Sequence, residues 1–468
     1  MNNLRLLDTR TKSLVDLMPI NKSEVTFYSC GPTVYDYTHI GHLRKFTMDD
    51  LLVRSLKYLG FGVKHVMNIT DVGHLVGDDT ESGEDKLEKG SRATGKTAYE
   101  VASFFTVDFL ENLKKMKIHS PTILCKATDH ITQMITLIEN LEKNGYTYKT
   151  SEALYFDISK FARYGALSGQ KLTDKLEGVR SEVKIDKDKK SPSDFALWFF
   201  VVGRFADHQM HWASPWGEGF PGWHIECSAM SMHYLGEQID IHSGGIDHIP
   251  VHHENEIAQS EGATGKSPFV KYWLHYNMLS INGDKMSKSL QNFTRLTDLE
   301  KLGFTGTQLR YLFLQTHYSS ELNFSLDALQ ASKTALFRLK NSISNFQKTD
   351  KIDDLSVEND YENEFQSAIC DNLNFPKALV LLWEVVKSDI SNSQKISLIE
   401  KFDTVLGLDL LNFEDKLLIP ENILELANMR LEAKKNGDFV KSDLIRNQIN
   451  THGYNILDSN GSFEITKK

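Results

Sequence analysis

The stretch Val25-Thr26-Phe27-Tyr28-Ser29 decides the fold, because a helical segment and a second apolar run follow it directly. The first run is rich in β-branched and aromatic residues and predicts a strand. From Ile40 to Leu59 the apolar residues recur at helical spacing, and Gly60 stops the predicted helix. Val63 to Thr70 predicts a second strand. Together they predict a βαβ unit with parallel strands, whose carboxyl ends lie near a helix start.

The rest of the chain extends this unit into a predicted α/β fold. We expect a Rossmann-like doubly wound parallel sheet with an inserted connective region, followed by an α-helical bundle and a small mixed α+β C-terminal domain. The predicted boundaries are 1–125 and 217–270 for the two halves of the sheet domain, 126–216 for the insertion, 271–330 for a loop region, 331–410 for the bundle and 420–468 for the last domain.

Local patterns predict the individual elements of the later segments. They are a helix from Thr97 to Lys115, strands from Gln238 to His242 and from Trp273 to Ile281, a helix from His253 to Gln259, a polar linker from Lys348 to Asp360, a helical segment from Glu362 to Lys387, two helices from Glu421 to Asn436 and from Phe439 to His452, and a hairpin around Asn460-Gly461.

The composition indicates a folded protein of the cytoplasm. The 468 residues can bury a large core without disulfides, and only four of them are cysteines. The longest apolar run, Phe195 to Val202, is too short to cross a bilayer, so no membrane partner is expected. The net charge of −10 opposes long-range attraction of a polyanion, and any contact with nucleic acid must therefore be local.

The string His39-Ile40-Gly41-His42 opens the predicted helix that follows the first strand. The free N–H groups and the dipole at a helix amino terminus stabilise phosphate oxygens. Gly41 has no Cβ, so a purine or a ribose can lie against the backbone there. His39 and His42 lie one turn apart and can direct their imidazoles at phosphates. Alone, such a short match is weak.

A second string, Lys285-Met286-Ser287-Lys288-Ser289, supplies the positive charge that a triphosphate site requires. Gly283 and the serines give a loop that can close over the phosphates. Lys285 and Lys288 can stabilise the negative charge that grows on bridging oxygens as pyrophosphate departs. The two strings together predict an ATP site.

A third segment, Gly90 to Thr97, matches the P-loop pattern letter for letter. A P-loop follows a buried strand, whereas Asp78 to Lys89 is almost wholly charged or small and predicts no strand. We therefore expect no nucleotide at this segment. A P-loop NTPase that uses Gly95, Lys96 and Thr97 is the alternative from a different class.

Cys30, Cys227, His252 and Glu256 form the candidate metal site. His252 and Glu256 stand four residues apart and share one face of a helix, and two thiolates could complete a tetrahedron that suits Zn²⁺. Cys30 lies at a predicted strand end, and polar residues surround Cys227. Cys125 and Cys370 are interpreted as buried cysteines without a chemical role.

Four ordered motifs resemble the cysteinyl-tRNA synthetases of bacterial type, which are class I aminoacyl-tRNA synthetases. The motifs are Cys30-Gly31-Pro32-Thr33-Val34-Tyr35-Asp36 running into His39 to His42, Gly222-Trp223-His224-Ile225-Glu226-Cys227-Ser228-Ala229-Met230, His252 to Glu256, and Lys285 to Ser289. The resemblance covers nearly the whole chain. It implies ATP-dependent ligation of L-cysteine to tRNA(Cys) through a cysteinyl-adenylate.

The same resemblance implies the ligands. One Zn²⁺ per chain would be held by Cys30, Cys227, His252 and Glu256 and would bind the thiolate of the substrate, while Mg²⁺ would accompany ATP. Other matching positions are Thr70 and Trp223 for the amino-acid pocket, and Gly244, Gly245 and Asp247 for adenosine. By the same resemblance, residues 331–410 and 420–468 resemble the anticodon-binding bundle and the small terminal domain, and we expect a monomer.

Three departures and one further alternative accompany the resemblance. Gln291 stands where family members commonly have glycine after the lysine-rich string, an acidic stretch follows Asp71, and Pro250-Val251 replaces the usual Phe-Pro before the histidines. Arg430, Lys434 and neighbouring basic residues could face tRNA phosphates, although acidic residues are interspersed among them.

A zinc-dependent ligase that attaches cysteine to an amino sugar is the nearest alternative, and the long helical tail favours tRNA.

Overall fold

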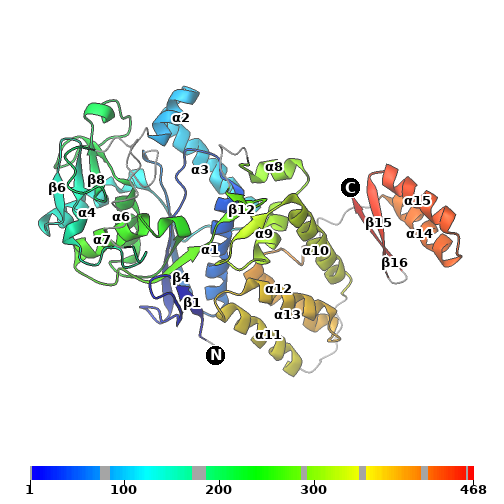
Figure 1. The fold of residues 1–468 in the computed structure, drawn as a ribbon. Helices are drawn as coiled ribbons and strands as arrows, with labels where there is room; N and C mark the ends of the chain where they lie inside the picture. Colours follow the sequence, from blue (N-terminus) through cyan, green and yellow to red (C-terminus); the bar gives the residue numbers. More distant parts are fainter. Residues whose placement is uncertain are drawn as a thin grey trace. The chain divides into compact units, whose positions relative to one another are not determined.

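The computed structural model describes residues 3–73, 85–170, 186–285, 292–346, 355–412, 420–459 and 462–467. The chain divides into two compact units, residues 1–410 and 411–468, and Figure 1 shows the fold of each.

The larger unit is built around a five-stranded parallel sheet with the order β11-β10-β3-β4-β5, so the predicted α/β class is confirmed. The strand order reverses at β3, because the strands that follow it along the chain lie on one side and the last two lie on the other. The strands are β3 Glu24–Ser29, β4 Gly62–Ile69, β5 Ile123–Lys126, β10 Ile239–Gly245 and β11 Val270–Tyr276.

Helix α1 (Ile40–Tyr58) connects β3 to β4, as predicted. His39 is its N-cap, and the side chain of His39 accepts a hydrogen bond from the backbone N–H of His42. Leu43 and Leu56 of its apolar stripe are fully buried. Gly60 follows the helix with a φ of 88°, a conformation that glycine adopts without a steric cost.

Further helices pack around the sheet, and a second, antiparallel sheet with the order β6-β7-β8-β9 lies beside α4 and α6 (Figure 1). The apolar run that begins at Phe195 forms the buried strand β8, next to a cluster of packed aromatic rings. The bounds are α3 Ala98–Lys115, α4 Ile131–Lys143, α6 Trp223–Leu235, α7 His252–Thr264, β6 Thr147–Lys149, β7 Ala153–Phe156, β8 Phe195–Phe200 and β9 Gly219–Pro221; β1 Arg5–Asp8 and β2 Ser13–Asp16 form a separate hairpin.

The predicted strand from Trp273 to Ile281 is wrong as a single element. β11 ends at Tyr276, and β12 (Leu279–Ile281) pairs with β13 (Asp284–Lys285) and β14 (Leu322–Phe324) in another sheet. The buried guanidinium of Arg44 donates to the carbonyls of Asn277 and Met278, at 2.9 and 2.6 Å. These two carbonyls, between β11 and β12, therefore bond to a side chain instead of to a neighbouring strand.

The helical part of the larger unit corrects two predictions. The polar segment that we expected as a linker is helical from Leu355 to Asp360, because its polar residues form the exposed face of α11. The helical segment expected from Glu362 to Lys387 consists of two helices, since Asn372 and Leu373 take positive φ values and Asn374 caps a new amino terminus. The helices are α8 Leu296–Lys301, α9 Gly306–Leu314, α10 Leu326–Ser344, α11 Leu355–Cys370, α12 Phe375–Lys387 and α13 Asn392–Leu406.

The smaller unit consists of α14 (Glu421–Lys435), α15 (Phe439–Thr451) and the antiparallel strands β15 (Tyr454–Ser459) and β16 (Ser462–Lys467). The predicted helices and hairpin strands are confirmed, while Asn460-Gly461 lies outside the described residues. Isoleucines form most of its core. Arg430 is 3% exposed and binds the carboxylate of Asp458 with both terminal nitrogens, so it does not face solvent as a phosphate contact would.

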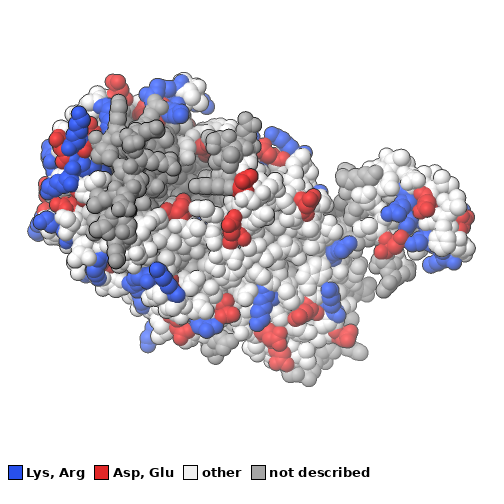
Figure 2. All heavy atoms as spheres, viewed as in Figure 1, with Lys and Arg blue, Asp and Glu red and all other residues white. Residues whose placement is uncertain are grey.

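Within the described residues, no helix combines the length and the apolar character needed to cross a bilayer. Figure 2 shows basic and acidic side chains interspersed over one face, with uncharged surface between them.

Candidate functional site

A cleft of about 530 Å³ opens at the carboxyl ends of β3, β4 and β10, next to the amino terminus of α1. This is the place where the strand order reverses and where open parallel sheets bind ligands. The predicted site residues that line it are Cys30, His39, Gly41, His42, Thr70, Trp223, Cys227, Gly245, Asp247 and His252. Glu256 lies buried behind this wall, and Gly244 faces the rings of His248 and His253 rather than the cleft.

The four predicted metal ligands converge at one end of the cleft. One donor atom from each of Cys30, Cys227, His252 and Glu256 lies within 4.8 Å of the others, and all four residues are buried. Nε2 of His252 and Oε1 of Glu256 are 3.0 Å apart, on adjacent turns of α7. Cys30 follows β3, and Cys227 lies in the second turn of α6.

The geometry and chemistry of these donors fit a soft divalent ion. The sulfur atoms of Cys30 and Cys227 are 3.9 Å apart and form no disulfide. Two thiolates bound to a tetrahedral Zn²⁺ at about 2.3 Å each lie roughly 3.8 Å apart. A donor set of two sulfur atoms, one imidazole nitrogen and one carboxylate oxygen suits zinc. The cluster is therefore a candidate metal-binding site.

The titration of the donors also favours a cation. Burial and the neighbouring imidazoles act in opposite directions on Glu256, and His242 and His252 prevail, lowering its pKa to about 2. Burial opposes protonation of His252, but Glu256 and Cys227 raise its pKa to about 10. Without an ion, a proton on His252 thus compensates the buried carboxylate. A divalent cation would replace that proton.

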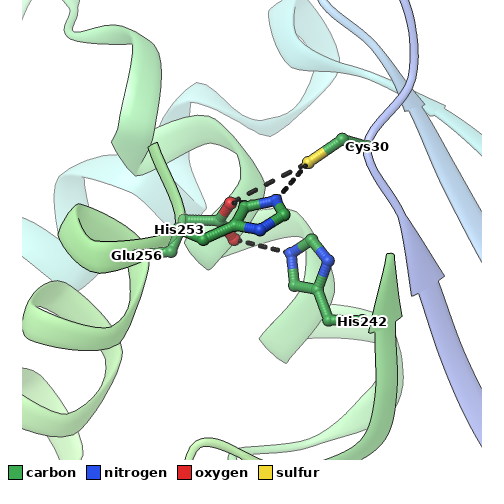
Figure 3. A group of neighbouring side chains, drawn as sticks. All are labelled: Cys30, His242, His253 and Glu256. Atoms are coloured by element: carbon green, nitrogen blue, oxygen red, sulfur yellow. Dashed lines mark hydrogen bonds and ion pairs between the residues drawn. The ribbon is translucent and has the colours of Figure 1, made fainter. Parts of the chain in front are cut away.

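A second group of donors shares two residues with the first. Figure 3 shows Cys30, His242, His253 and Glu256, with the imidazoles of His242 and His253 directed at the other two side chains. Nε2 of His242 lies 2.9 Å from Oε2 of Glu256, and Nε2 of His253 lies 3.4 Å from the sulfur of Cys30. In turn, Nδ1 of His253 lies 2.7 Å from Nε2 of His275.

These imidazoles resemble the outer shell that orients metal ligands in other proteins. His242 fixes one oxygen of Glu256 while the other oxygen lies beside His252. Nδ1 of His224 lies 2.8 Å from Nδ1 of His252 and so occupies the ring nitrogen that faces away from the carboxylate. Sequence reasoning missed His224, His242 and His275. Their positions near strand ends or within the quoted motifs were the available signal.

The helix that begins after His39 presents its amino terminus to the cleft. The imidazoles of His39 and His42 stack, with centroids 3.5 Å apart. Burial lowers the pKa of His39 to about 4, so its ring is neutral at pH 7 and offers hydrogen bonds rather than charge. Gly41 leaves the backbone of the first turn open to the cleft.

The amino-acid end of the cleft contains Thr70 and Trp223. The hydroxyl of Thr70 donates to Oε2 of Glu226 at 2.9 Å and accepts from the side-chain amide of Asn68 at 3.1 Å. Burial raises the pKa of Glu226 well above its usual range. The indole of Trp223 packs 4.3 Å, centroid to centroid, from the ring of His252. Sequence reasoning did not assign to Asn68 and Glu226 their role in holding Thr70.

The lysine-rich string is only partly described. The backbone of Lys285 belongs to β13, and its side chain is not described. Lys288 and Gln291 lie outside the described residues. The predicted roles of both lysines stay predictions.

The P-loop match at Gly90 to Thr97 does not form a phosphate-binding loop. Its first half belongs to α2 (Lys86–Thr94), Gly95 ends that helix with a φ of 68°, and Thr97 caps α3. The segment connects two helices, whereas a P-loop connects a strand to a helix.

Comparisons with known proteins agree with this geometry. The profile of the tRNA synthetases class I (C) catalytic domain matches residues 16–334. The chain is 42% identical to the cysteine–tRNA ligase of Treponema denticola, with 98% of each chain covered, and 38% identical to that of Chlorobaculum tepidum, with 100% of each covered.

Two solved structures share the fold. The LeuRS of Agrobacterium radiobacter, in a ternary complex with tRNA and LeuAMS, has a TM-score of 0.59 at 12% identity and covers 84% of each chain. The methionyl-tRNA synthetase of Mycobacterium tuberculosis, in complex with methionyl-adenylate, has a TM-score of 0.56 at 14% identity and covers 82% of this chain and 88% of that one.

Proposed function

The chain belongs to the cysteine–tRNA ligases, a family of class I tRNA synthetases, and from this premise we propose that it joins L-cysteine to tRNA(Cys) in two steps. First, the carboxylate of cysteine attacks the α-phosphorus of ATP, which forms cysteinyl-adenylate and releases pyrophosphate. Second, a hydroxyl of the terminal ribose of tRNA attacks the adenylate and releases AMP. The observation that carries the proposal is the cluster of Cys30, Cys227, His252 and Glu256 beside the cleft.

We expect one Zn²⁺ in this cluster, and the bound ion would supply a soft Lewis acid for the thiolate of the substrate. Serine has almost the same shape as cysteine, and shape alone separates such pairs by only about 1–3 kcal/mol. A thiol, with a pKa of about 8.5, becomes an anionic ligand far more readily than a hydroxyl does. Thr70 and Trp223 line the cleft beside the cluster and would enclose the side chain.

The amino terminus of α1 would bind the phosphates of ATP, which Mg²⁺ accompanies. His39 and His42 would donate hydrogen bonds there, and Gly41 would leave room for the nucleoside. Gly245, the last residue of β10, and Asp247 line the same cleft, which supports their proposed contact with adenosine. Gly244 keeps this turn of the backbone compact, since a Cβ there would come within 2.6 Å of His253.

The remaining assignments rest on the family alone. Lys285 and Lys288 would stabilise the departing pyrophosphate. Residues 271–330 would carry the lysine-rich loop and contact the tRNA stem, residues 331–410 would bind the anticodon, and 420–468 would form the small terminal domain. We further propose a cytoplasmic monomer.

The decisive experiment is pyrophosphate exchange into ATP with cysteine and with serine, before and after treatment with a zinc chelator. We expect exchange with cysteine only, its loss on chelation and its recovery when Zn²⁺ is returned. Addition of tRNA should then yield a cysteinyl ester. A chelated enzyme that is still active and still prefers cysteine over serine would contradict the proposed role of the metal.

The two alternatives have no support in this chain. The segment Gly90 to Thr97 lacks the strand that a P-loop needs, and the similarity over nearly the full length is to cysteine–tRNA ligases rather than to sugar ligases. An amino sugar that accepts cysteine in place of tRNA would revive the second alternative.

A further inference from the structure

Lys45 is a cation in the cleft wall that none of the motifs above includes. It lies on α1, one turn after His42, and its side chain is 14% exposed. Its Nζ donates to the carbonyl oxygen of Cys30 at 2.5 Å and lies 2.8 Å from Oδ2 of Asp49. The ammonium thus contacts the backbone of a predicted metal ligand while it belongs to the helix that would bind phosphate.

Lys45 is also the only lysine or arginine among the described residues that line the cleft. Burial lowers the pKa of His39 and of His248 to about 4 each, so both rings are neutral at pH 7. Asp36 and Asp247 add negative charge to the same wall. The proton on His252, described above, would be replaced by a metal bound to the cluster. Among the described residues of the cleft lining, Lys45 is then the cation that remains.

The ammonium retains a donor for a ligand. It has three N–H groups; the carbonyl of Cys30 accepts from one, while Oδ2 of Asp49 lies 2.8 Å from Nζ as an ion-pair partner without hydrogen-bond geometry. Asp49 also accepts from the hydroxyls of Ser243 and Tyr276, at 2.6 and 2.8 Å. The negative charge of Asp49 thus interacts with these two hydroxyls as well as with Lys45, so it does not fully neutralise the ammonium.

The position of Lys45 matches the place where the reaction must occur. The substrate's sulfur would lie at the cluster that contains Cys30, and the α-phosphate would lie at the amino terminus of α1. The substrate's carboxylate, which attacks the α-phosphate, has to lie between these two points. Lys45 lies there as well, because it belongs to α1 and its ammonium donates a hydrogen bond to the carbonyl of Cys30. An ammonium between two anions offsets their repulsion.

We propose that Lys45 binds the carboxylate of the substrate amino acid and holds it against the α-phosphate of ATP. The inference rests on the proposed function and adds to it the residue that orients the attacking group. Lys45 is then a catalytic residue, since its ammonium touches the nucleophile.

The test compares cysteine with cysteamine, which keeps the thiol and the amine but has no carboxylate. Calorimetric titration of the zinc-loaded protein gives both affinities for the wild type and for Lys45→Met. Because a hydrogen bond to a charged group contributes about 1.5–3 kcal/mol, we expect Lys45→Met to bind cysteine roughly 10- to 100-fold more weakly and cysteamine nearly unchanged. Lys45→Arg should recover part of the affinity for cysteine.

Lys64→Met is the matched control, because the ammonium of Lys64 also donates to a backbone carbonyl, that of Tyr234 at 2.6 Å, but lies outside the cleft lining. It should change neither affinity. If Lys45 only supported Cys30, then Lys45→Met would weaken both ligands equally and lower the zinc content, which would overturn the proposal. Lys45→Gln provides the same test should the methionine variant misfold. Failure of the wild type to bind cysteine would instead refute the proposed function itself.

Discussion

Nε2 of His242 lies 2.9 Å from Oε2 of Glu256, in a site where neither residue is exposed to solvent. The contact joins the middle of β10 to the second turn of α7 and directs the other oxygen of Glu256 at His252. A carboxylate held in this way is oriented for a metal before the metal binds, which is the function of outer-shell partners in metal sites.

His242→Phe should therefore lower the affinity for zinc by roughly 10- to 100-fold, the usual loss when an outer-shell partner is removed. Phenylalanine retains a ring against Trp273, with which His242 stacks at 4.6 Å. Competition with a chelator measures the affinity. His65→Phe is the control. Like His242, His65 is buried and forms a side-chain hydrogen bond, but its partner is the hydroxyl of Ser29 at 2.9 Å rather than one of the four predicted metal ligands. Equal losses in both variants would contradict the assignment.

Cys227→Ala should abolish both zinc binding and cysteine binding, because it removes one of the two sulfur donors. Metal analysis of the purified variant and calorimetry with cysteine check the two losses. Cys125→Ala is the matched control, since the Cys125 thiol is buried and donates to the carbonyl of Met67 instead. A Cys227→Ala protein with a full complement of zinc and ordinary cysteine affinity would refute the metal site.

The parts of the fold and the site that could be predicted are those with a local signal. The spacing of apolar residues was sufficient for β3, α1 and β4, and ordered motifs identified Cys30 and Cys227. The pairing of β3 with β10 depends on contacts between residues far apart in the chain, and the approach of His242 to Glu256 depends on how α7 packs against β10. The break after Tyr276 was missed because it depends on Arg44, which is remote in the sequence.

Lys288→Ala should slow formation of the adenylate by about 100-fold or more, because it removes a charge expected to stabilise the transition state. The affinity for cysteine should stay unchanged, since the thiol end of the cleft is separate from the pyrophosphate. Single-turnover kinetics and calorimetry measure the two quantities. Lys301→Ala, at a side chain 74% exposed, should change neither. Weaker cysteine binding with a normal rate would reverse the assignment.

Lys96→Ala should leave ATP turnover unchanged. Lys96 follows the end of α2, and its ammonium lies 5.2 Å from the centre of the Phe104 ring. The lysine thus packs on an aromatic ring and does not follow a strand, as the lysine of a phosphate-binding P-loop does. The neighbouring Thr97 caps α3 by accepting from the N–H of Glu100, and Thr97→Ala should cost about 1 kcal/mol of stability. A large fall in turnover for the folded Lys96→Ala protein would restore the P-loop hypothesis.

Asp50 connects α1 to the helices that follow it, through a buried ion pair whose stability should depend on pH. Its Oδ2 accepts from Arg310 at 2.6 Å and from Arg54 at 2.7 Å. Burial opposes the charge of Asp50, but Arg310, His119 and Arg54 together prevail and lower its pKa below the usual range. Folding thus favours the ionised form, so the stabilisation is complete above about pH 4, the pKa of an unfolded aspartate, and declines as the pH falls.

Asp50→Asn should destabilise the protein by about 3–5 kcal/mol at pH 7, because the guanidinium of Arg310, 0% exposed, loses its counter-ion. The deficit relative to the wild type should shrink below pH 4, because Asp50 takes up a proton in the unfolded wild-type chain while it stays ionised in the folded protein. Urea unfolding at pH 7, 5 and 3 measures it. Asp298→Asn removes an ion pair with Arg295 in which the side chains are 31% (Arg295) and 36% (Asp298) exposed, and it should cost less than about 1 kcal/mol. A deficit for Asp50→Asn that stays constant into acid would show that packing, not charge, is what the substitution removes.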